Sequence, residues 1–222
     1  MTRPEDIFQH SSTSGWIVVV SEAPRLGGAF PHLPERLLEK MDISRPTVCL
    51  AAGDSLTPEL NAFLEDVEAL LGNPASLWQL MEEPPSEMAS AGLMVLVGGV
   101  VEDWVSGLDN TLVGEVVLQC LGRGGVIFAI GDSAAALGTW FLPSGEDEIR
   151  EGLNWLTGAL VLPNEPEPAE LDAVRGLLAG QPKAYALGLA GGSLVAFGPQ
   201  GQTEVWGETQ PRLILGGGWA EA

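Results

Sequence analysis

One stretch of the chain, VIFAIGDSAAA at residues 126–136, decides how the sequence is interpreted. Its first five residues are apolar, which is typical of a strand buried on both faces, and the small residues after it suit a sharp turn into a short helix. In that setting the side chain of Ser133 would be lifted out of the sheet, and the amide of Ala134 would point at a developing oxyanion. Ser133 is therefore a candidate nucleophile, although a serine at this place also suits a helix cap.

Similar apolar runs occur three times before this stretch, at Trp16–Val20, Thr47–Ala52 and Leu93–Val97. Amphipathic helices are expected between them, because apolar residues recur every three to four positions within residues 58–71 and again within residues 113–122. Alternating strands and helices predict βαβ units. The expected fold class is therefore α/β, with a mostly parallel central sheet and helices on both faces.

The pattern changes after Gly138. An irregular loop is expected at Thr139–Arg150, a short strand at Ala159–Leu162 and a helix through Leu171–Leu178. Three short apolar runs separated by glycine and proline turns then predict an antiparallel C-terminal extension. These runs are Ala184–Leu189, Leu194–Phe197 and Thr203–Trp206. Neither a repeat nor a linker interrupts the sequence, so we expect a single domain over residues 1–222, of which residues 1–14 are a loosely ordered segment.

The composition limits the classes of partner. Ten Lys and Arg against thirty Asp and Glu give a net charge of −20, so no nucleic-acid partner and no membrane surface are expected, since both favour clustered cationic side chains. The apolar stretches are too short to span a bilayer, and the polar N-terminus does not resemble a secretory signal. Cys49 and Cys120 lie in apolar runs and are expected to be buried, which fits a cytoplasmic protein. The sequence has neither metal-ligand spacing nor a dinucleotide loop, so no metal and no cofactor are expected.

Several dispersed stretches can be compared with known motifs in their order along the chain. They are Val95–Gly99, Arg123–Val126 leading into Ser133, Gly152–Leu156, Gly188–Phe197 and Val205–Gly207. Together they resemble the cyanophycinase and aspartyl-dipeptidase (peptidase E) family of serine peptidases. The resemblance implies a class I glutamine-amidotransferase-like fold. It also implies an oxyanion hole formed by backbone amides around Gly99 and Ala134, and a substrate pocket beside Gly98, Val100 and Asp132.

The same resemblance fails at most of the positions that carry chemistry. The family's activating histidine falls on Asn164, which cannot accept a proton at neutral pH. The family's acidic pair falls on Ala190 and Gly191. A substitute base would have to be His10, in the polar N-terminal segment, or His32, in the loop after the first strand. His32 is closer to the predicted site, although entry into a helix is the simpler role for it.

Two functions remain open at this point. The first is a catalytically degenerate relative of these peptidases that keeps the elbow serine and serves as a binding or scaffold protein. The second is an active serine hydrolase or peptidase that acts on a small peptide or acyl substrate through Ser133, with His32 as a non-standard base. Either function allows a homo-oligomer.

Overall fold

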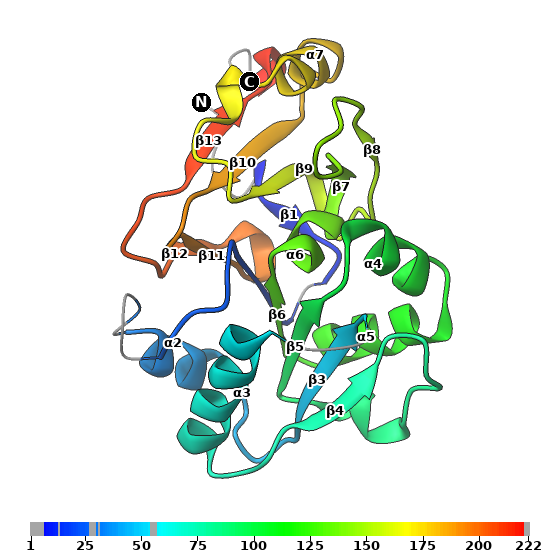
Figure 1. Cartoon of the computed structure of the whole chain (residues 1–222), viewed down its shortest axis with the longest axis vertical. Coiled ribbons are helices and arrows are strands. Elements are labelled where there is room, and N and C mark those ends of the chain that lie inside the picture. The colour runs from blue at the N-terminus through cyan, green and yellow to red at the C-terminus, as the bar shows by residue number, and fades with distance from the viewer. Residues whose placement is uncertain (1–6, 13, 27–29, 31, 54–56, 220–222) are drawn as a thin grey trace.

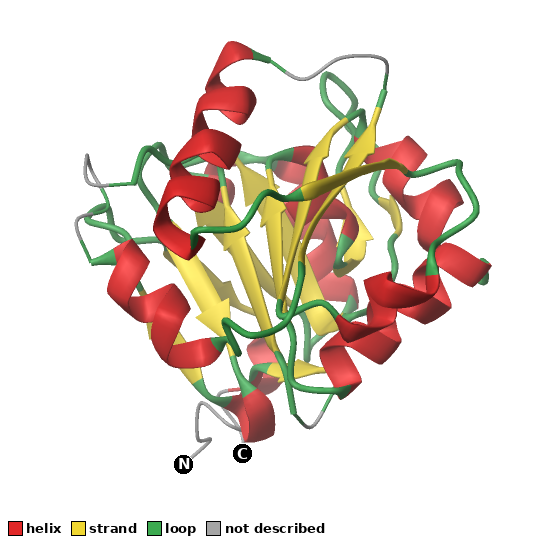
Figure 2. Cartoon of the chain, turned by 90° about the horizontal axis from the view of Figure 1, so that it is seen from below, coloured by secondary structure: helices red, strands yellow, loops and turns green. Residues whose placement is uncertain are grey.

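The computed structural model describes residues 7–12, 14–26, 30, 32–53 and 57–219. Within this part of the chain, the strands form two β-sheets (Figure 1). Both sheets contribute side chains to one apolar core. The larger sheet has seven strands and the smaller has six. Helices flank the strands on both sides (Figure 2).

The larger sheet contains the predicted parallel strands. Its order is β12 (Thr203–Val205), β11 (Leu194–Phe197), β2 (Trp16–Val20), β6 (Val126–Ile130), β5 (Leu93–Gly98), β3 (Thr47–Ala52) and β4 (Ser76–Gln79). The strands from β2 to β4 in this order are parallel, whereas β11 and β12 pair in antiparallel fashion. All residues of β2 and β6 are buried, which explains their continuous apolar sequence.

Two pairs of helices cover the two faces of this sheet. Helices α2 and α3 pack on one face, where the ring of Phe63 stacks on that of Phe128 with centroids 5.2 Å apart. Helices α4 and α5 pack on the other face, where they bury Trp104 completely. The bounds of these helices are α2 (Leu33–Lys40), α3 (Pro58–Leu71), α4 (Val101–Leu108) and α5 (Leu112–Gly122).

The smaller sheet is built mainly from the C-terminal third of the chain. Its order is β13 (Arg212–Leu215), β10 (Tyr185–Leu189), β9 (Leu156–Pro163), β7 (Gly138–Phe141) and β8 (Arg150–Glu151), and β1 (Gln9–His10) also pairs with β9. Strand β9 is parallel to both β7 and β10. Helix α7 (Asp172–Gly180) covers one face of this sheet, and the other face joins the core of the larger sheet together with α6 (Asp132–Ala136). Short 3-10 turns lie at Ser86–Ser90, Pro168–Glu170, Pro199–Gly201 and Gly217–Trp219.

The α/β fold class, the four parallel strands and the helices predicted within residues 58–71 and 113–122 are confirmed. Two local predictions are wrong. The segment Thr139–Arg150 is not only a loop, because it contains most of β7. Strand β10 does not form a hairpin with β11, because the chain crosses from the smaller to the larger sheet between these two strands.

Candidate active site

The turn between β6 and α6 has a positive φ at Gly131. This glycine has φ 63° and ψ −124°, a conformation that residues with a Cβ rarely adopt. In a nucleophile elbow, the residue at the sharp turn between strand and helix is the nucleophile itself. The residue whose backbone conformation matches that position is Gly131, two residues before the serine that the sequence pattern indicated, and we call Gly131 the elbow position.

Ser133 lies inside the protein instead of facing a concave site. Its side chain is fully buried. The hydroxyl accepts a hydrogen bond from the Ile130 amide at 2.8 Å and donates to the carbonyl oxygen of Leu96 at 2.9 Å. The prediction that Ser133 faces a concave site is therefore wrong. Its hydroxyl is used to join the ends of β5 and β6.

The predicted oxyanion donor is also engaged elsewhere. The amide of Ala134 donates to the carbonyl oxygen of Gly131 at 2.9 Å, and Ala134 is fully buried. With Gly131 at the elbow, the next amide along the chain is that of Asp132. The elbow and its neighbouring donor are therefore shifted by two residues from the predicted ones.

The turn after β5 is held close to the elbow. Gly98 and Gly99 have φ 73° and 65°, and a Cβ on Gly99 would lie 2.5 Å from the Cβ of Ala52, so only glycine fits there. The buried indole of Trp104 donates its Nε1 hydrogen to the carbonyl oxygen of Gly98 at 2.7 Å. Val100 precedes α4 with 52% of its surface exposed, outside the cavity that the two turns enclose.

That cavity has a volume of about 280 Å³. Its lining includes the backbone turns at Gly98, Gly99 and Gly131 and the carboxylate residues Glu22, Glu59 and Asp132. Burial, and to a smaller extent the charge of Glu102, raises the pKa of Asp132. Negative side chains next to the turns would oppose the charge that develops on an oxyanion, because like charges repel more strongly where water is partly excluded.

Asn164 lies close to the elbow. It follows β9 with φ 60°, and its side-chain amide donates to the carbonyl oxygen of Ser21 at 3.5 Å. A Cβ on Gly131 would lie 3.6 Å from the same oxygen. The structure therefore brings Gly131, at the elbow position, close to Asn164, at the position predicted for the base.

His32 does not line the elbow cavity. It precedes α2, its side chain is 76% exposed, and its Nδ1 lies 3.8 Å from a carboxylate oxygen of Glu35. The residues around it at 27–29 and 31 lie outside the described part of the chain. The other histidine, His10, is half-buried in β1 on the smaller sheet, where its Nδ1 accepts a hydrogen bond from the Ser12 amide.

Metal and thiol chemistry have no group to support them in the described residues. No cluster of three or more His, Cys, Asp or Glu side chains there could hold a metal ion. Cys49 and Cys120 are buried, and burial raises the pKa of their thiols to about 12 and about 11, which makes them inert. No helix in the described ranges has the length and apolar character needed to cross a bilayer.

No protein-family model and no curated protein matches this sequence. Solved structures do match its fold. A peptidase from an acI-B1 Actinobacterium aligns with a TM-score of 0.59 at 15% identity, over 94% of this chain and 97% of that one. A putative peptidase E protein from Listeria monocytogenes EGD-e aligns with a TM-score of 0.54 at 10% identity, over 90% of this chain and 98% of that one.

This chain has a peptidase E-like fold. The similarity extends over nearly the whole length of both structures, and at these identities it concerns the fold alone. Sequence reasoning missed Gly131 as the elbow residue, although a glycine directly after a buried strand is a signal for positive φ. It also missed Ser21, whose hydroxyl donates to the carbonyl oxygen of Ala190 at 2.9 Å and fixes the end of β2. A lone serine there carries no sequence signal.

Proposed function

We propose that this protein is a catalytically inactive member of the peptidase E-like fold with a binding or scaffold role. The observation that carries the proposal is the residue at the elbow, because Gly131 has no side chain to act as a nucleophile. The hydroxyl of Ser133 is bonded to backbone inside the protein. Serine hydrolysis needs an accessible hydroxyl beside a base, and Asn164 cannot act as that base.

The charge of the elbow cavity supports the same proposal. A hydrolytic site stabilises negative charge on the substrate oxygen, whereas Glu22, Glu59 and Asp132 make this cavity negative. Such a lining suits the ammonium or amide hydrogens of a small peptide better than an acyl oxyanion. We therefore favour a small peptide as the ligand of the elbow cavity, bound without cleavage.

The other expectations from the sequence remain part of this proposal. The chain is taken to be a single domain and a cytoplasmic protein, which its two buried reduced cysteines support. Nucleic acid is not a proposed partner, because a net charge of −20 repels phosphate. A homo-oligomer is compatible with the proposed role.

A fluorophosphonate probe, which reacts with activated serines, tests this proposal. The native protein is incubated with the probe at neutral pH, beside a known serine hydrolase as a positive control, and labelled peptides are mapped by mass spectrometry. We expect the control alone to be labelled. Labelling of the native protein at Ser133 that is lost in Ser133→Ala would overturn the proposal in favour of an active hydrolase.

A further inference from the structure

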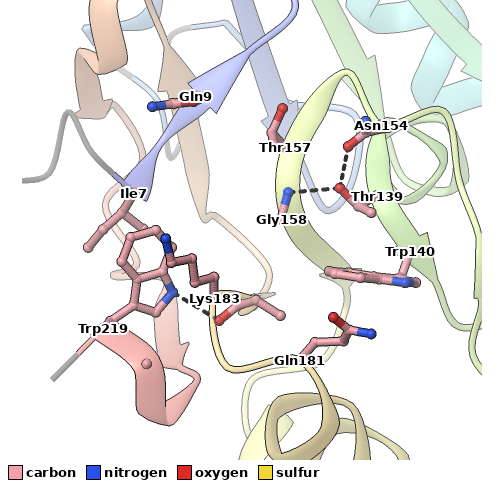
Figure 3. A pocket seen from close by; sticks show the side chains of 12 residues that line it. Ile7, Gln9, Thr139, Trp140, Asn154, Thr157, Gly158, Gln181, Lys183 and Trp219 are labelled. Atoms are coloured by element: carbon pink, nitrogen blue, oxygen red, sulfur yellow. Dashed lines mark hydrogen bonds between the residues drawn. The ribbon is translucent and has the colours of Figure 1, made fainter. Parts of the chain in front are cut away.

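A second cavity, of about 550 Å³, lies in the smaller sheet and shares no lining residue with the elbow cavity (Figure 3). It lies where β9 changes its neighbour, because Thr157 pairs with Gln9 of β1 whereas Ala159 pairs with Tyr185 of β10. Between these pairs Gly158 has φ 75°. This interruption of β9, an inner strand of the smaller sheet, forms one wall of the cavity.

That wall is rigid. The amide of Gly158 donates to the hydroxyl oxygen of Thr139 at 2.7 Å, and this hydroxyl also lies 2.5 Å from the side-chain oxygen of Asn154 (Figure 3). A strand held in this way presents the neighbouring side chains of Thr157 and Gln9 in fixed positions. Sites built on strands are more precise than sites built on loops.

Two indoles line the cavity from opposite sides. Figure 3 shows Trp219 with Lys183 on one side and Trp140 with Gln181 on the other. The Nε1 hydrogen of Trp219 is bonded to the carbonyl oxygen of Ala184 at 3.2 Å, which fixes the orientation of its ring. Indole rings offer a large apolar face at a small cost in conformational entropy, and they stack on flat rings.

Lys183 supplies the charge of the cavity, and no Asp or Glu is among the lining residues that the structure describes. The other lysine and arginine side chains in the described ranges form ion pairs or donate to backbone carbonyls. Lys183 does neither with any described residue. In a chain of net charge −20, a lysine without an ion pair, in a cavity whose described lining holds no carboxylate, is a favourable place to hold an anion.

We propose that this cavity binds a small monocarboxylate whose acid group lies next to a ring. Lys183 pairs with the carboxylate, and the indoles of Trp140 and Trp219 cover the ring. One ammonium group matches the charge of one carboxylate, whereas a phosphate favours several donors or an arginine fork. The cavity volume falls in the range of about 300–1,000 Å³ that is common for small-ligand sites. This proposal does not depend on the elbow.

The indole hydrogens allow a direct test by ¹⁵N–¹H NMR. The chain has seven tryptophans, so the indole signals of Trp140 and Trp219 act as reporters and the other indoles act as internal controls. Three acids, benzoate, indole-3-acetate and glucuronate, are titrated separately, each beside its neutral primary amide. We expect at least one acid to shift both reporter signals in a saturable way, and its amide to bind at least about tenfold more weakly.

Three variants test whether Lys183 causes the preference for the acid over its neutral amide. In Lys183→Met we expect the difference between acid and amide to disappear, whereas Lys183→Arg keeps it. Arg36→Met removes the same charge from the exposed surface of α2 and should leave binding unchanged. The proposal is overturned if acid and amide bind alike to the native protein, if the other indoles shift in place of the reporters, or if no acid shifts them up to about 20 mM.

Discussion

The hydroxyl of Ser133 donates to the carbonyl oxygen of Leu96 across 2.9 Å, and this bond fixes the first turn of α6 to the end of β5. The same hydroxyl accepts the amide hydrogen of Ile130, the last residue of β6. Ser133 is therefore a structural residue between the two strands whose carboxyl ends form the elbow cavity.

Replacing Ser133 by alanine should destabilise the protein by about 1–3 kcal/mol, because the buried Ile130 amide then has no acceptor. Urea denaturation followed by circular dichroism measures this change. Ser106→Ala is the matched control, since the Ser106 hydroxyl is exposed and donates within its own helix, and its effect should stay within about 0.5 kcal/mol. Equal effects of the two variants would contradict the structural role of Ser133.

A serine at residue 131 together with a histidine at residue 164 should create a reactive hydroxyl. Gly131→Ser has room, because a Cβ there contacts only the Ser21 carbonyl oxygen, at 3.6 Å, although its positive φ costs about 1–3 kcal/mol of stability. We expect fluorophosphonate labelling of residue 131 in the double variant Gly131→Ser/Asn164→His, weaker labelling in Gly131→Ser, and none in Asn164→His. Absence of labelling in the folded double variant would show that Gly131 is not the elbow position.

The indole of Trp104 should stabilise the glycine turn after β5. Trp104→Phe keeps an aromatic ring in the core but removes the donor to the Gly98 carbonyl oxygen, so we expect a loss of about 1–3 kcal/mol. Hydrogen exchange should also become faster at the amides of Gly98 and Gly99. Trp78→Phe is the control, because the buried Nε1 of Trp78 has no hydrogen-bond partner among the described residues, and it should leave exchange at this turn unchanged.

The stability of the protein should fall in mildly acidic solution through His10. Burial lowers the pKa of His10 from its usual 6.5, and a hydrogen bond with the Gly198 backbone opposes this in part. The unfolded chain therefore binds the proton more readily, so this contribution to the free energy of unfolding is complete above pH 6.5 and is lost as the pH falls through the lowered pKa. His10→Gln should flatten the profile just below pH 6.5.

Denaturation curves at several pH values measure this profile. The matched control is His32→Gln, because His32 is exposed on the surface before α2. That variant should keep the native dependence on pH. A native profile that does not change in His10→Gln would refute the role of His10.

Much of the larger sheet and its helices could be predicted, because the residues at the helix ends and the spacing of the apolar residues indicate the same elements. Helix α3 begins with Thr57, whose side chain accepts the Leu60 amide hydrogen, and ends at Gly72 with φ 71°. Threonine, proline and glycine occupy the positions that favour them, and the apolar spacing between them has a helical period. In the smaller sheet the residue pattern does not mark the ends of the strands as clearly. Gly158 interrupts β9, so only residues 159–162 of an eight-residue strand could be recognised.

The site could be predicted only to its neighbourhood. The sequence predicted that Gly99 and Asn164 lie near Ser133, because each follows a strand at the carboxyl edge of its sheet. In the structure Gly99 lines the cavity beside Gly131, and the Asn164 side chain bonds to the carbonyl oxygen of Ser21. The sequence pattern placed the elbow at Ser133, because Gly131–Asp132–Ser133 matches a serine motif. In the structure the positive φ of the turn is at Gly131, two residues earlier. Which residue takes a positive φ depends on where β6 stops pairing with its neighbours, and residue patterns locate strand ends only to within a few residues.

The open space beside Gly131 has an evolutionary consequence. A glycine codon that ends in a pyrimidine becomes a serine codon by one base change, and any asparagine codon becomes a histidine codon by one base change. If the Gly131 codon ends in a pyrimidine, one base change at each of two codons supplies the serine and histidine side chains that a serine peptidase would need, and a Cβ at residue 131 clashes with nothing in the described structure. A hydroxyl at residue 131 could therefore be gained or lost without a change in the packing of the sheet.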